Sequence, residues 1–361
     1  MKLMDKDIEI SKMLINWYND NKRELPWRQT TDPYKIWISE IILQQTRVAQ
    51  GLDYYIRFIN RFPTIELLAE AKEEEVLKYW QGLGYYSRAR NLHATAQTIV
   101  AQFGGVFPSS YENILSLRGI GEYTAAAIVS FAWNMPYPVV DGNVFRVLSR
   151  LFGLDIPIDS SKGKKEFSKL AYVIMDEENA LLHNQAIMDF GALVCTPQNP
   201  SCQNCPFTNK CIALAADDIQ RYPVKQHKTK SRDRFFHYFH IERDDFTYLY
   251  RRNDKDIWKG LFEFPHIETD GAVDFSELME TSDFKELFLT KDRLGISLVL
   301  DKKKHVLSHQ VIYATFYRVK ISDYYPSLDC FIQIKSDDLQ HYAIPRLIHI
   351  YLEKLDENFA N

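Results

Sequence analysis

The sequence lacks the features of a membrane or secreted protein. No apolar run in its 361 residues approaches the roughly 20 residues that span a bilayer. Asp5, Asp7 and Glu9 stand where a signal peptide would need its apolar stretch. We therefore expect a cytoplasmic protein with no membrane association.

The sequence also lacks an excess of basic residues, internal repeats and low-complexity tracts. Its 44 lysines and arginines are outnumbered by 48 aspartates and glutamates, which gives a formal net charge of −4. The field of the whole molecule therefore does not attract nucleic acid, so any such binding must come from local patches. A chain of this length with 46 % hydrophobic residues is long enough for two cores.

The apolar pattern divides the chain into two domains. Over 1–217, apolar residues recur at helical spacing, which predicts an all-α domain. The segment 218–234 loses this pattern and is basic, as expected of a linker. Over 235–361 the period changes to two, which predicts an α+β domain. We expect helices at 66–80, 87–103, 123–133, 143–152 and 344–355, and strands at 235–241, 246–251, 296–300 and 311–320.

Four of the five cysteines lie within a short segment, spaced C-x6-C-x2-C-x5-C. Disulfides are disfavoured in a cytosolic chain of this size, so the cluster indicates a metal site. Zinc sites usually pair two close cysteine couples, whereas this spacing has one, so a 4Fe–4S cluster fits better. The cluster either carries electrons or holds its loop in place, and we favour the second role because metal binding supplies folding energy. The ligands would be Cys195, Cys202, Cys205 and Cys211.

Two glycine turns are candidate sites for nucleic acid. Gly119 and Gly121 permit a sharp turn whose amides precede the next helix, an arrangement suited to a backbone phosphate. The segment 81–90 forms a second glycine turn with two tyrosines and two arginines, a combination suited to wedging a base step and gripping phosphates. The alternatives are a plain helix connection, core tyrosines and solvated arginines.

Two carboxylates occupy unlike settings. Glu40 has apolar helical neighbours and no basic partner among them, so we expect a raised pKa and a retained proton. Asp141 precedes the apolar stripe that begins at Val144, so it lies at a helix N-terminus, where an ionised carboxylate is favoured. Such a pair suits cleavage of a glycosidic bond, although an edge glutamate and a simple N-cap are the structural alternatives.

Six features follow one another along the chain: LPWR at 25–28, SEIILQQT at 39–46, GLGYY at 82–86, GIG at 119–121, VDGNV at 140–144, and the four cysteines. In this order they resemble the helix-hairpin-helix DNA glycosylases, and among them the adenine DNA glycosylases of the MutY type. The resemblance implies a monofunctional enzyme of base excision repair. It would hydrolyse the N-glycosidic bond of adenine mispaired with 8-oxoguanine or guanine in double-stranded DNA, and we expect a monomer.

The resemblance assigns roles to single residues of the candidate active site. Glu40 matches the glutamate that protonates adenine N7, and Asp141 matches the aspartate that stabilises the sugar cation. Asn143 would help to position the attacking water. Tyr123 stands where the related endonuclease III family has a lysine that forms a Schiff base. A tyrosine cannot form one, so we expect it to hydrogen-bond near Asp141 and to leave the abasic strand intact.

The resemblance also implies the contacts with DNA and the cofactor. Gln45 and Tyr85 would enter the duplex beside the lesion, with Leu83 packed there, once adenine has flipped out of the stack. All four clustered cysteines match ligands of a 4Fe–4S cluster. A basic face for the DNA backbone, and hence a steep salt dependence, is expected from the linker together with Arg47, Arg88, Arg90 and Arg118.

Residues 235–361 resemble the Nudix-like, MutT-like domain of this family, most clearly in WKGLFEFP at 258–265. The R-E-x-x-E-E pattern that holds magnesium in Nudix hydrolases is missing after Pro265, so this domain should bind rather than hydrolyse. The family reads 8-oxoguanine with a Phe-Ser-His tip. Ser308 and His309 match it, but Leu307 replaces the aromatic residue. An ordinary turn at a strand end is the alternative.

Two other functions stay open. The first is a glycosylase with lyase activity on oxidised pyrimidines, like endonuclease III, which Tyr123 and the extra C-terminal domain disfavour. The second is a non-enzymatic mismatch binder or redox sensor, in which the cluster acts and both carboxylates are structural. Release of adenine separates the enzyme from the binder, and borohydride trapping on damaged DNA identifies the lyase.

Overall fold

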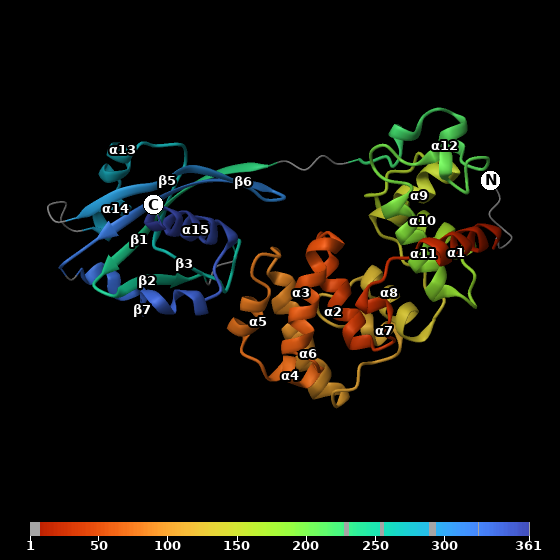
Figure 1. The fold of residues 1–361 in the computed structure, drawn as a ribbon, viewed down its shortest axis with the longest axis horizontal. Coiled ribbons are helices and arrows are strands. Elements are labelled where there is room, and N and C mark those ends of the chain that lie inside the picture. The colour runs from red at the N-terminus through yellow and green to blue at the C-terminus, as the bar shows by residue number, and fades with distance from the viewer. Residues whose placement is uncertain (1–7, 227–230, 253–255, 289–293, 324, 361) are drawn as a thin grey trace. The chain divides into compact units, whose positions relative to one another are not determined.

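The computed structural model describes residues 8–226, 231–252, 256–288, 294–323 and 325–360, which form two compact units (Figure 1). The first unit comprises the chain up to Glu70 and Asn91–Lys228, and the second comprises Ala71–Arg90 and the chain from Thr229 onward. Ala71–Arg90 thus belongs to the second unit although it lies within the first 217 residues. None of the described helices has the length and apolar character needed to cross a membrane.

The first unit is helical, as the spacing of its apolar residues predicts. The first turn of α6 lies in the segment that belongs to the second unit. The α-helices are α1 (Glu9–Asn21), α2 (Pro33–Leu43), α3 (Val48–Arg61), α4 (Ile65–Glu70), α6 (Ser87–Phe103), α7 (Tyr111–Leu115), α8 (Glu122–Trp133), α9 (Gly142–Phe152), α10 (Ser161–Val173), α11 (Ala180–Leu193) and α12 (Ile212–Ala215), with single 3-10 turns η1 (Pro26–Arg28), η2 (Cys202–Asn204) and η3 (Ile219–Arg221).

Local sequence signals explain several helix boundaries. Asp32 caps α2 by accepting a hydrogen bond from the Tyr34 amide, and Pro33 occupies the first helical position. The single helix expected at 66–80 is wrong, because α4 ends at Glu70 and α5 (Glu73–Tyr79) starts anew after Lys72 adopts an extended backbone. The acidic residues 73–75 fill the first turn of α5, where the helix dipole favours negative charge.

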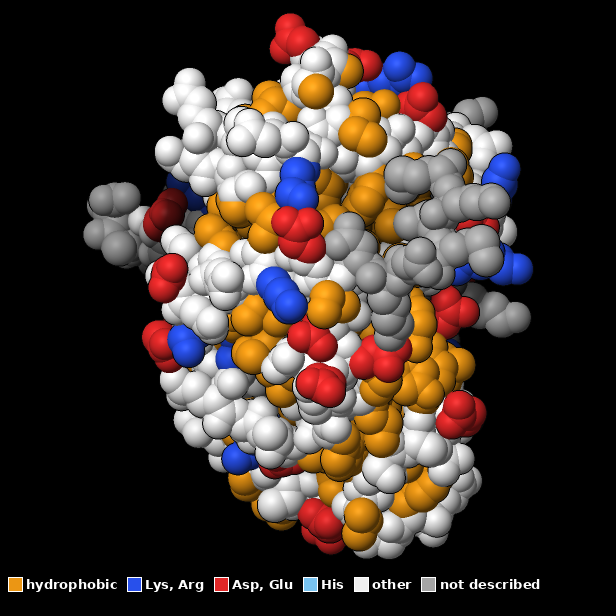
Figure 2. All heavy atoms as spheres, turned by 90° about the vertical axis from the view of Figure 1, so that its right-hand side faces the viewer, with side chains coloured by type: hydrophobic (Ala, Val, Ile, Leu, Met, Phe, Trp, Pro, Cys, Tyr) orange, Lys and Arg blue, Asp and Glu red, His pale blue; other side chains and the backbone are white. Residues whose placement is uncertain are grey.

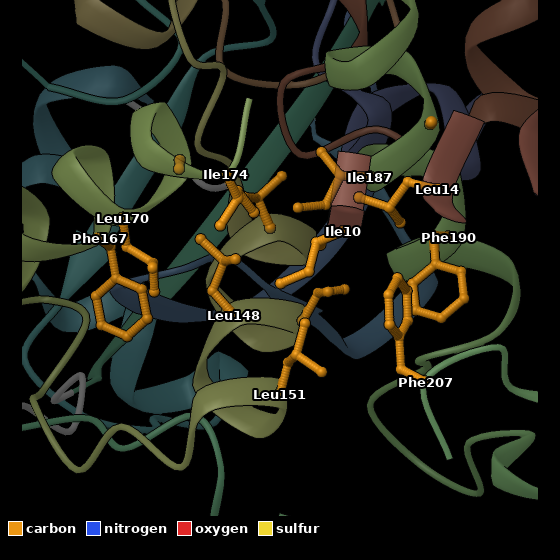
Figure 3. Packing of buried hydrophobic residues seen from close by; sticks show 14 of the residues in the cluster. Ile10, Leu14, Leu148, Leu151, Phe167, Leu170, Ile174, Ile187, Phe190 and Phe207 are labelled. Carbon is orange, nitrogen blue, oxygen red and sulfur yellow. The ribbon is translucent and has the colours of Figure 1, made fainter. Parts of the chain in front are cut away.

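The core of the first unit joins four helices to the cysteine loop. Leu148 and Leu151 of α9 meet Leu14 of α1 and side chains of α10 and α11 (Figure 3). Phe207, which lies between two of the clustered cysteines, packs edge-on against a ring of α11, with ring centroids 5.4 Å apart. The same core therefore fixes the start of α9 and one side of the cysteine loop.

The second unit is built on a seven-stranded sheet in the order β3-β2-β1-β6-β5, with β4 paired to β1 and β7 to β2. Its core occupies both faces: residues of α15 cover one face and residues of α13 and α14 cover the other. The strands are β1 (Arg232–Arg243), β2 (Phe246–Arg251), β3 (Phe262–Glu263), β4 (His266–Thr269), β5 (Gly295–Val306), β6 (Gln310–Lys320) and β7 (Ile332–Lys335); the helices are α5, α13 (Phe275–Glu280), α14 (Ser282–Leu287), α15 (Arg346–Ala360) and the 3-10 turns η4 (Pro326–Cys330) and η5 (Ser336–His341).

The two strands expected at 235–241 and 246–251 form a hairpin, and the first of them is also part of a parallel pair. β1 and β2 run antiparallel with Glu242 opposite Thr247, and Asp244 in the turn has a positive φ of 52°. β6 runs parallel to β1 along its whole length and antiparallel to β5. The turn between β5 and β6, which carries the predicted tip at 307–309, therefore lies beside the start of β1.

Contacts of α5 show why Ala71–Arg90 belongs to the second unit. The Lys78 ammonium donates a hydrogen bond to the Tyr342 carbonyl oxygen at 3.0 Å. Arg251 forms an ion pair with Glu74, with its Nη2 at 2.9 Å from Oε1. A Cβ atom on Gly260 would lie 3.2 Å from a side-chain atom of Leu77. The main chain just before β3 therefore lies close to α5.

The described part of the predicted linker is bound to the first unit. Arg221 pairs with Asp155 at 2.8 Å, and the Gln226 amide donates to Asp159 at 2.8 Å. Residues 227–230 lie outside the described residues, and β1 begins at Arg232. A linker role for the whole segment 218–234 stays a prediction.

The surface shown in Figure 2 has intermixed charges. Acidic, basic and apolar side chains alternate on this face, and the described lysines and arginines on it do not gather into one area. This mixed surface agrees with the net charge of −4.

The core around α9 gives a first prediction. Leu148 is fully buried, so Leu148→Ala removes apolar contacts and leaves a cavity, and it should lower the free energy of unfolding by about 2–5 kcal/mol. Chemical denaturation followed by circular dichroism measures the change. Leu67→Ala is the control, because Leu67 is 42 % exposed and its loss should change stability by about 0.5 kcal/mol or less. Equal effects of both substitutions would contradict this account of the core.

Candidate active site

A pocket of about 540 Å³ opens in the first unit and is lined by all four residues predicted to be catalytic. Glu40 comes from α2, Tyr123 from α8, and Asp141 and Asn143 from the start of α9. Gln45, predicted to enter DNA, lines the same pocket. Its volume falls in the range of about 300–1,000 Å³ that is typical of small-ligand sites, which is ample for one nucleobase.

The carboxyl group of Glu40 is buried because α2 is buried. Eight of the eleven residues of α2 are buried, and Glu40 itself is only 6 % exposed. Burial raises the pKa of Glu40 to about 7, and the nearby Asp141 also raises it, while a hydrogen bond from Tyr123 and the charge of Arg28 act in the opposite direction. The expected direction of the pKa shift is confirmed. Arg28 was not expected beside Glu40, because it comes from η1 and not from the helix that carries Glu40.

The hydroxyl of Tyr123 is the hydrogen-bond donor to Glu40. Its oxygen lies 2.9 Å from Glu40 Oε2, and Asp141 lies close enough to both groups to raise their pKa values, so the expected hydrogen bond near Asp141 is present and Glu40 is its acceptor. Burial raises the pKa of Tyr123 well above 10, so the phenol keeps its proton at neutral pH. Glu40 is the acceptor because Tyr123 lies in the first turn of α8, which packs against α2.

Asp141 is the N-cap of α9, as predicted. Its Oδ1 accepts hydrogen bonds from the Asn143 and Val144 amides, each at 2.8 Å, and its Oδ2 accepts one from the Asn143 side chain at 2.7 Å. Burial nevertheless raises the pKa of Asp141, and these hydrogen bonds and Arg146 offset the rise. The prediction from the helix N-terminus alone omitted burial, because the sequence does not show that a pocket wall surrounds this cap.

The glycine turn before α8 has the predicted conformation. Gly119 has a φ of 78°, and a Cβ atom there would lie 2.7 Å from the Asn91 side chain, so both backbone and space require glycine. Gly121 is the N-cap of α8, and Ile120 between the two glycines is buried. Arg118 is exposed, and its carbonyl oxygen accepts a hydrogen bond from Thr95. The turn is thus anchored from inside while its glycines and Arg118 face solvent.

The second glycine turn, at 82–86, lies in the second unit. Leu83 is buried, whereas Tyr85 is 44 % exposed and has a positive φ of 46°. Arg88 donates hydrogen bonds to the carbonyl oxygens of Leu83 and Gly84, at 3.3 Å and 3.1 Å, and lies over the Trp80 ring. Burial lowers the pKa of Arg88 to about 10. Arg88 therefore holds the turn together, a role that the sequence did not suggest.

The predicted tip at 307–309 lies next to this second turn. A pocket of about 480 Å³ in the second unit is lined by residues of both segments. The hydroxyl groups of Tyr85 and Ser308 are hydrogen-bonded to each other, which joins two sites that are far apart in the sequence. The lining includes Leu83, Tyr85, Arg90, Trp258, His305, Leu307, Ser308, His309 and Gln310.

The four clustered cysteines line one small cavity of the first unit, of about 30 Å³. The Phe207 amide lies 3.4 Å from Cys205 Sγ, and Arg150 Nη1 lies 3.5 Å from Cys195 Sγ, so donors approach the sulfur atoms. Within the described part of the chain, no group of three or more His, Cys, Asp or Glu residues is close enough to hold a metal ion. A 4Fe–4S cluster places each cysteine on a different iron, so this donor set and its positively charged neighbour fit such a group.

Comparisons with known proteins agree with this geometry. The HhH-GPD superfamily of base excision DNA repair proteins matches residues 38–171, and the NUDIX domain matches residues 237–354. An adenine DNA glycosylase of Buchnera aphidicola from Schizaphis graminum is 38 % identical over 72 % of this chain and 75 % of its own. Another, from Acyrthosiphon pisum, is 32 % identical over 96 % of this chain and 98 % of its own. The chain belongs to the adenine DNA glycosylase family.

Two solved structures share the fold of more than half of this chain. The structure of a thermostable thymine-DNA glycosylase aligns with 57 % of this chain over 95 % of its own length, with a TM-score of 0.54 and 29 % sequence identity. Endonuclease III in a non-covalent complex with DNA covers 58 % of this chain and 94 % of its own with a TM-score of 0.51 and 23 % identity, which shows the fold alone. The adenine DNA glycosylase of Homo sapiens is 41 % identical over 55 % of this chain and 38 % of its own.

The structure adds pocket residues to those expected of an adenine DNA glycosylase. Arg28 lines the pocket and donates two hydrogen bonds to Asp189, which is fully buried on α11, with Nη2 at 2.6 Å from Oδ1. Arg23 pairs with the same carboxylate. Gln185, also on the pocket wall, accepts a hydrogen bond from Tyr18 at 2.7 Å. The one signal in the sequence was the single acidic residue, Asp189, on a helix that is mostly apolar beyond its polar segment 183–185.

Arg146 is a further residue that the sequence analysis missed. It lines the pocket one turn into α9, and its Nη2 donates a hydrogen bond to Asn143 Oδ1 at 2.9 Å. Because Asn143 in turn donates to Asp141, the three side chains form one chain of hydrogen bonds. Arg146 therefore orients the amide that contacts Asp141.

The hydrogen bond from Tyr123 gives a second prediction. Tyr123→Phe removes a donor that stabilises the ionised carboxylate, so the pKa of Glu40 should rise above its value of about 7. Carbon-13 NMR titration of side-chain-labelled glutamate measures this pKa, with Glu40→Gln identifying the signal. Tyr137→Phe is the control, since Tyr137 stacks on Tyr111 in another part of the unit. An unchanged or lower pKa in Tyr123→Phe would show that the hydrogen bond does not set it.

Proposed function

We propose that this protein is a monofunctional DNA glycosylase that excises adenine mispaired with 8-oxoguanine or guanine, and that it acts as a monomer in base excision repair. The observation that supports this most directly is the pocket that holds Glu40, with a pKa of about 7, together with Asp141. Membership of the adenine DNA glycosylase family and the match to base excision repair proteins support the choice of substrate.

Cleavage of the glycosidic bond needs a proton donor and a negative charge. Glu40, half protonated near pH 7, gives its proton to adenine N7 as the bond to the sugar breaks. Asp141, ionised with the help of three donated hydrogen bonds, stabilises the oxocarbenium-like sugar. Asn143, held by Arg146, positions the water that completes the hydrolysis. Adenine reaches the pocket by flipping out of the stack.

Tyr123 accounts for the absence of strand cleavage in this proposal. Its phenol is held on Glu40 and contains no amine that could form a Schiff base with the sugar. The product is then an intact strand with an abasic site. Tyr123 also lowers the pKa of Glu40, so that the glutamic acid is re-protonated and deprotonated near neutral pH rather than kept permanently protonated.

Three features support contact with the DNA around the lesion. Gln45 and Tyr85 both have a positive φ, of 58° and 46°, and such backbone strain is frequent at functional sites. The exposed turn with Gly119 and Gly121 precedes the N-terminus of α8 and suits a backbone phosphate. In the second unit, Ser308 and His309 offer polar groups beside Tyr85 to read the base opposite adenine.

We propose that Cys195, Cys202, Cys205 and Cys211 hold a 4Fe–4S cluster. The cluster would cross-link the loop after α11, and its role is then structural, because Phe207 ties this loop to the core of α9 and α11. None of the proposed proton transfers passes through the cluster.

A test of the reaction is single-turnover incubation with a duplex that carries adenine opposite 8-oxoguanine, scored for strand breaks with and without alkali. Breaks only after alkali are expected. Glu40→Gln and Asp141→Asn should each slow excision by about 100-fold or more, because each removes a group that acts on the transition state. Glu112→Gln, on the exposed part of α7, is the control.

The rival functions give different results in the same assay. Breaks without alkali, together with trapping by borohydride, would identify a lyase. Tight binding without breaks would identify a mismatch-binding protein. A Glu40→Gln variant with a near-normal rate would sink the general-acid role, provided that the variant still binds the duplex.

The cluster gives a prediction of its own. Cys202→Ala should lower the iron and acid-labile sulfide bound per chain and should lower the melting temperature, because a ligand and a cross-link of the loop are lost. Cys330→Ala is the matched control, since Cys330 is exposed and lies outside the cluster. Iron, sulfide and melting temperature that remain unchanged in Cys202→Ala would exclude the proposed ligand set.

A further inference from the structure

The second unit contains a set of connected charged side chains near the turn between β5 and β6. Its members are joined by hydrogen bonds and ion pairs; two arginines and one glutamate are buried, and the other two carboxylates are partly exposed at its rim. We call them the arginine network: Arg234, Arg252, Asp256, Glu263 and Glu268.

The inner end of the arginine network is Glu263 on β3, which is fully buried. Its Oε1 accepts a hydrogen bond from Arg252 Nη1 at 2.7 Å, and its Oε2 accepts one from the Tyr238 hydroxyl at 3.1 Å. Arg252 continues to Asp256, with Nη2 at 2.8 Å from Oδ2. A buried carboxylate is thereby connected to the wall of the second pocket, which Asp256 lines.

The outer end of the network is Arg234 on β1, whose side chain is only 8 % exposed. Its guanidinium makes paired hydrogen bonds to Asp256, at 2.9 Å and 2.8 Å, and to Glu268, at 2.7 Å and 2.6 Å. These two forks fix the plane of the guanidinium group, because both of its edges are held by carboxylates. The Arg234 guanidinium also lies 4.7 Å from the centre of the Phe236 ring.

The oriented Arg234 then reaches the turn that carries Ser308. Its Nη1 donates a hydrogen bond to the side-chain oxygen of Gln310 at 3.0 Å. The main chain of Gln310 closes the same turn, because its carbonyl oxygen accepts a hydrogen bond from the Leu307 amide at 2.8 Å. Ser308 and His309 lie between these two residues. Gln310 is therefore the residue through which the network holds the turn.

Folding of this unit does not by itself explain why Arg234, Arg252 and Glu263 are buried here. Taking ions out of water costs several kcal/mol each, and a buried ion pair is often no more stabilising than an apolar replacement. The neighbouring side chains Phe236, Tyr238 and Phe264 already form a fully buried apolar core. An arginine held by two carboxylates has a fixed orientation, so it can direct one further hydrogen bond, here the one to Gln310. An apolar side chain cannot do this.

Such a fixed direction matters for reading a base. 8-Oxoguanine differs from guanine by one oxygen and one N–H group, so a protein distinguishes them by hydrogen bonds whose strength falls steeply with misalignment. Ser308 carries a hydroxyl on a short turn, held by Tyr85 on one side. Any freedom of the turn would weaken the contact with the oxidised base and leave contacts common to both bases.

We propose that Gln310 is a positioning residue for recognition of the base opposite adenine: anchored by Arg234, it sets the position of the Ser308 turn and hence the preference for 8-oxoguanine over guanine. This inference rests on the function proposed above. It extends the recognition site from the turn to a side chain that holds it and to the buried charges behind that side chain.

The test uses two substitutions of Gln310 in the full-length protein. Gln310→Met keeps the size of the side chain and removes the acceptor, whereas Gln310→Glu keeps an acceptor for Arg234. Neither leaves a charge of the network unpaired, as a substitution of Arg234 would. Arg318→Met is the control, because Arg318 pairs with Glu242 at the opposite end of β6.

Two quantities are measured for each variant. The first is amide hydrogen exchange of residues 305–310, which reports the order of the turn without any substrate. The second is the ratio of single-turnover excision rates for adenine opposite 8-oxoguanine and opposite guanine. In Gln310→Met, exchange should accelerate and the ratio should fall about tenfold, the loss expected for one hydrogen bond to a charged group. Gln310→Glu should restore both, and Arg318→Met should change neither.

Unchanged exchange in Gln310→Met would overturn the inference, and so would faster exchange with an unchanged ratio. A fall of the ratio in Gln310→Glu equal to that in Gln310→Met would also overturn it, because the acceptor would then be irrelevant. An unmodified protein that excises adenine from neither duplex would refute the proposed function instead, while hydrogen exchange would still decide whether Gln310 holds the turn.

Discussion

The low polarity around one carboxyl group governs the chemistry of the first unit. Glu40 lies on a helix that is buried on nearly all sides, so an ionised Glu40 is disfavoured and a neutral one persists up to about pH 7. The surrounding elements adjust this value in both directions: α8 supplies a phenol, η1 supplies a guanidinium, and the start of α9 supplies a second carboxylate. A proton donor that works at neutral pH thus results from helix packing rather than from any unusual residue.

The two carboxylates of the pocket illustrate how far a local pattern predicts chemistry. The apolar neighbours of Glu40 and the N-cap position of Asp141 are visible in the sequence, and both placements are correct. The direction of the pKa shift of Glu40 followed from its apolar neighbours. The hydrogen-bond partner of Tyr123 and the burial of Asp141 could not be predicted in this way. They depend on how α2, α8 and α9 pack, whereas helical spacing describes contacts within one helix only.

The residues that sequence reasoning missed have one feature in common. Asp189 is separated from Arg28 by 161 positions, and Gln310 is separated from Arg234 by 76. Neither pair leaves a periodic signal, since each arises where two distant elements meet. Arg88 was expected to face phosphates because arginine beside glycine and tyrosine suggests DNA, and its contact with DNA stays a prediction. The structure adds hydrogen bonds from Arg88 to two carbonyl oxygens of its own turn, which residue type alone does not show.

The assignment of Ala71–Arg90 to the second unit has a topological consequence. The polypeptide leaves the first unit after Glu70, returns to it at Asn91, and leaves it again beyond Lys228. The polypeptide therefore crosses from one unit to the other three times rather than once. After a single proteolytic cut at the last crossing, the C-terminal fragment would stay bound to segment 71–90 of the N-terminal fragment through the contacts of Lys78 and Glu74. An N-terminal fragment ending there would keep α5 without the surface on which it packs.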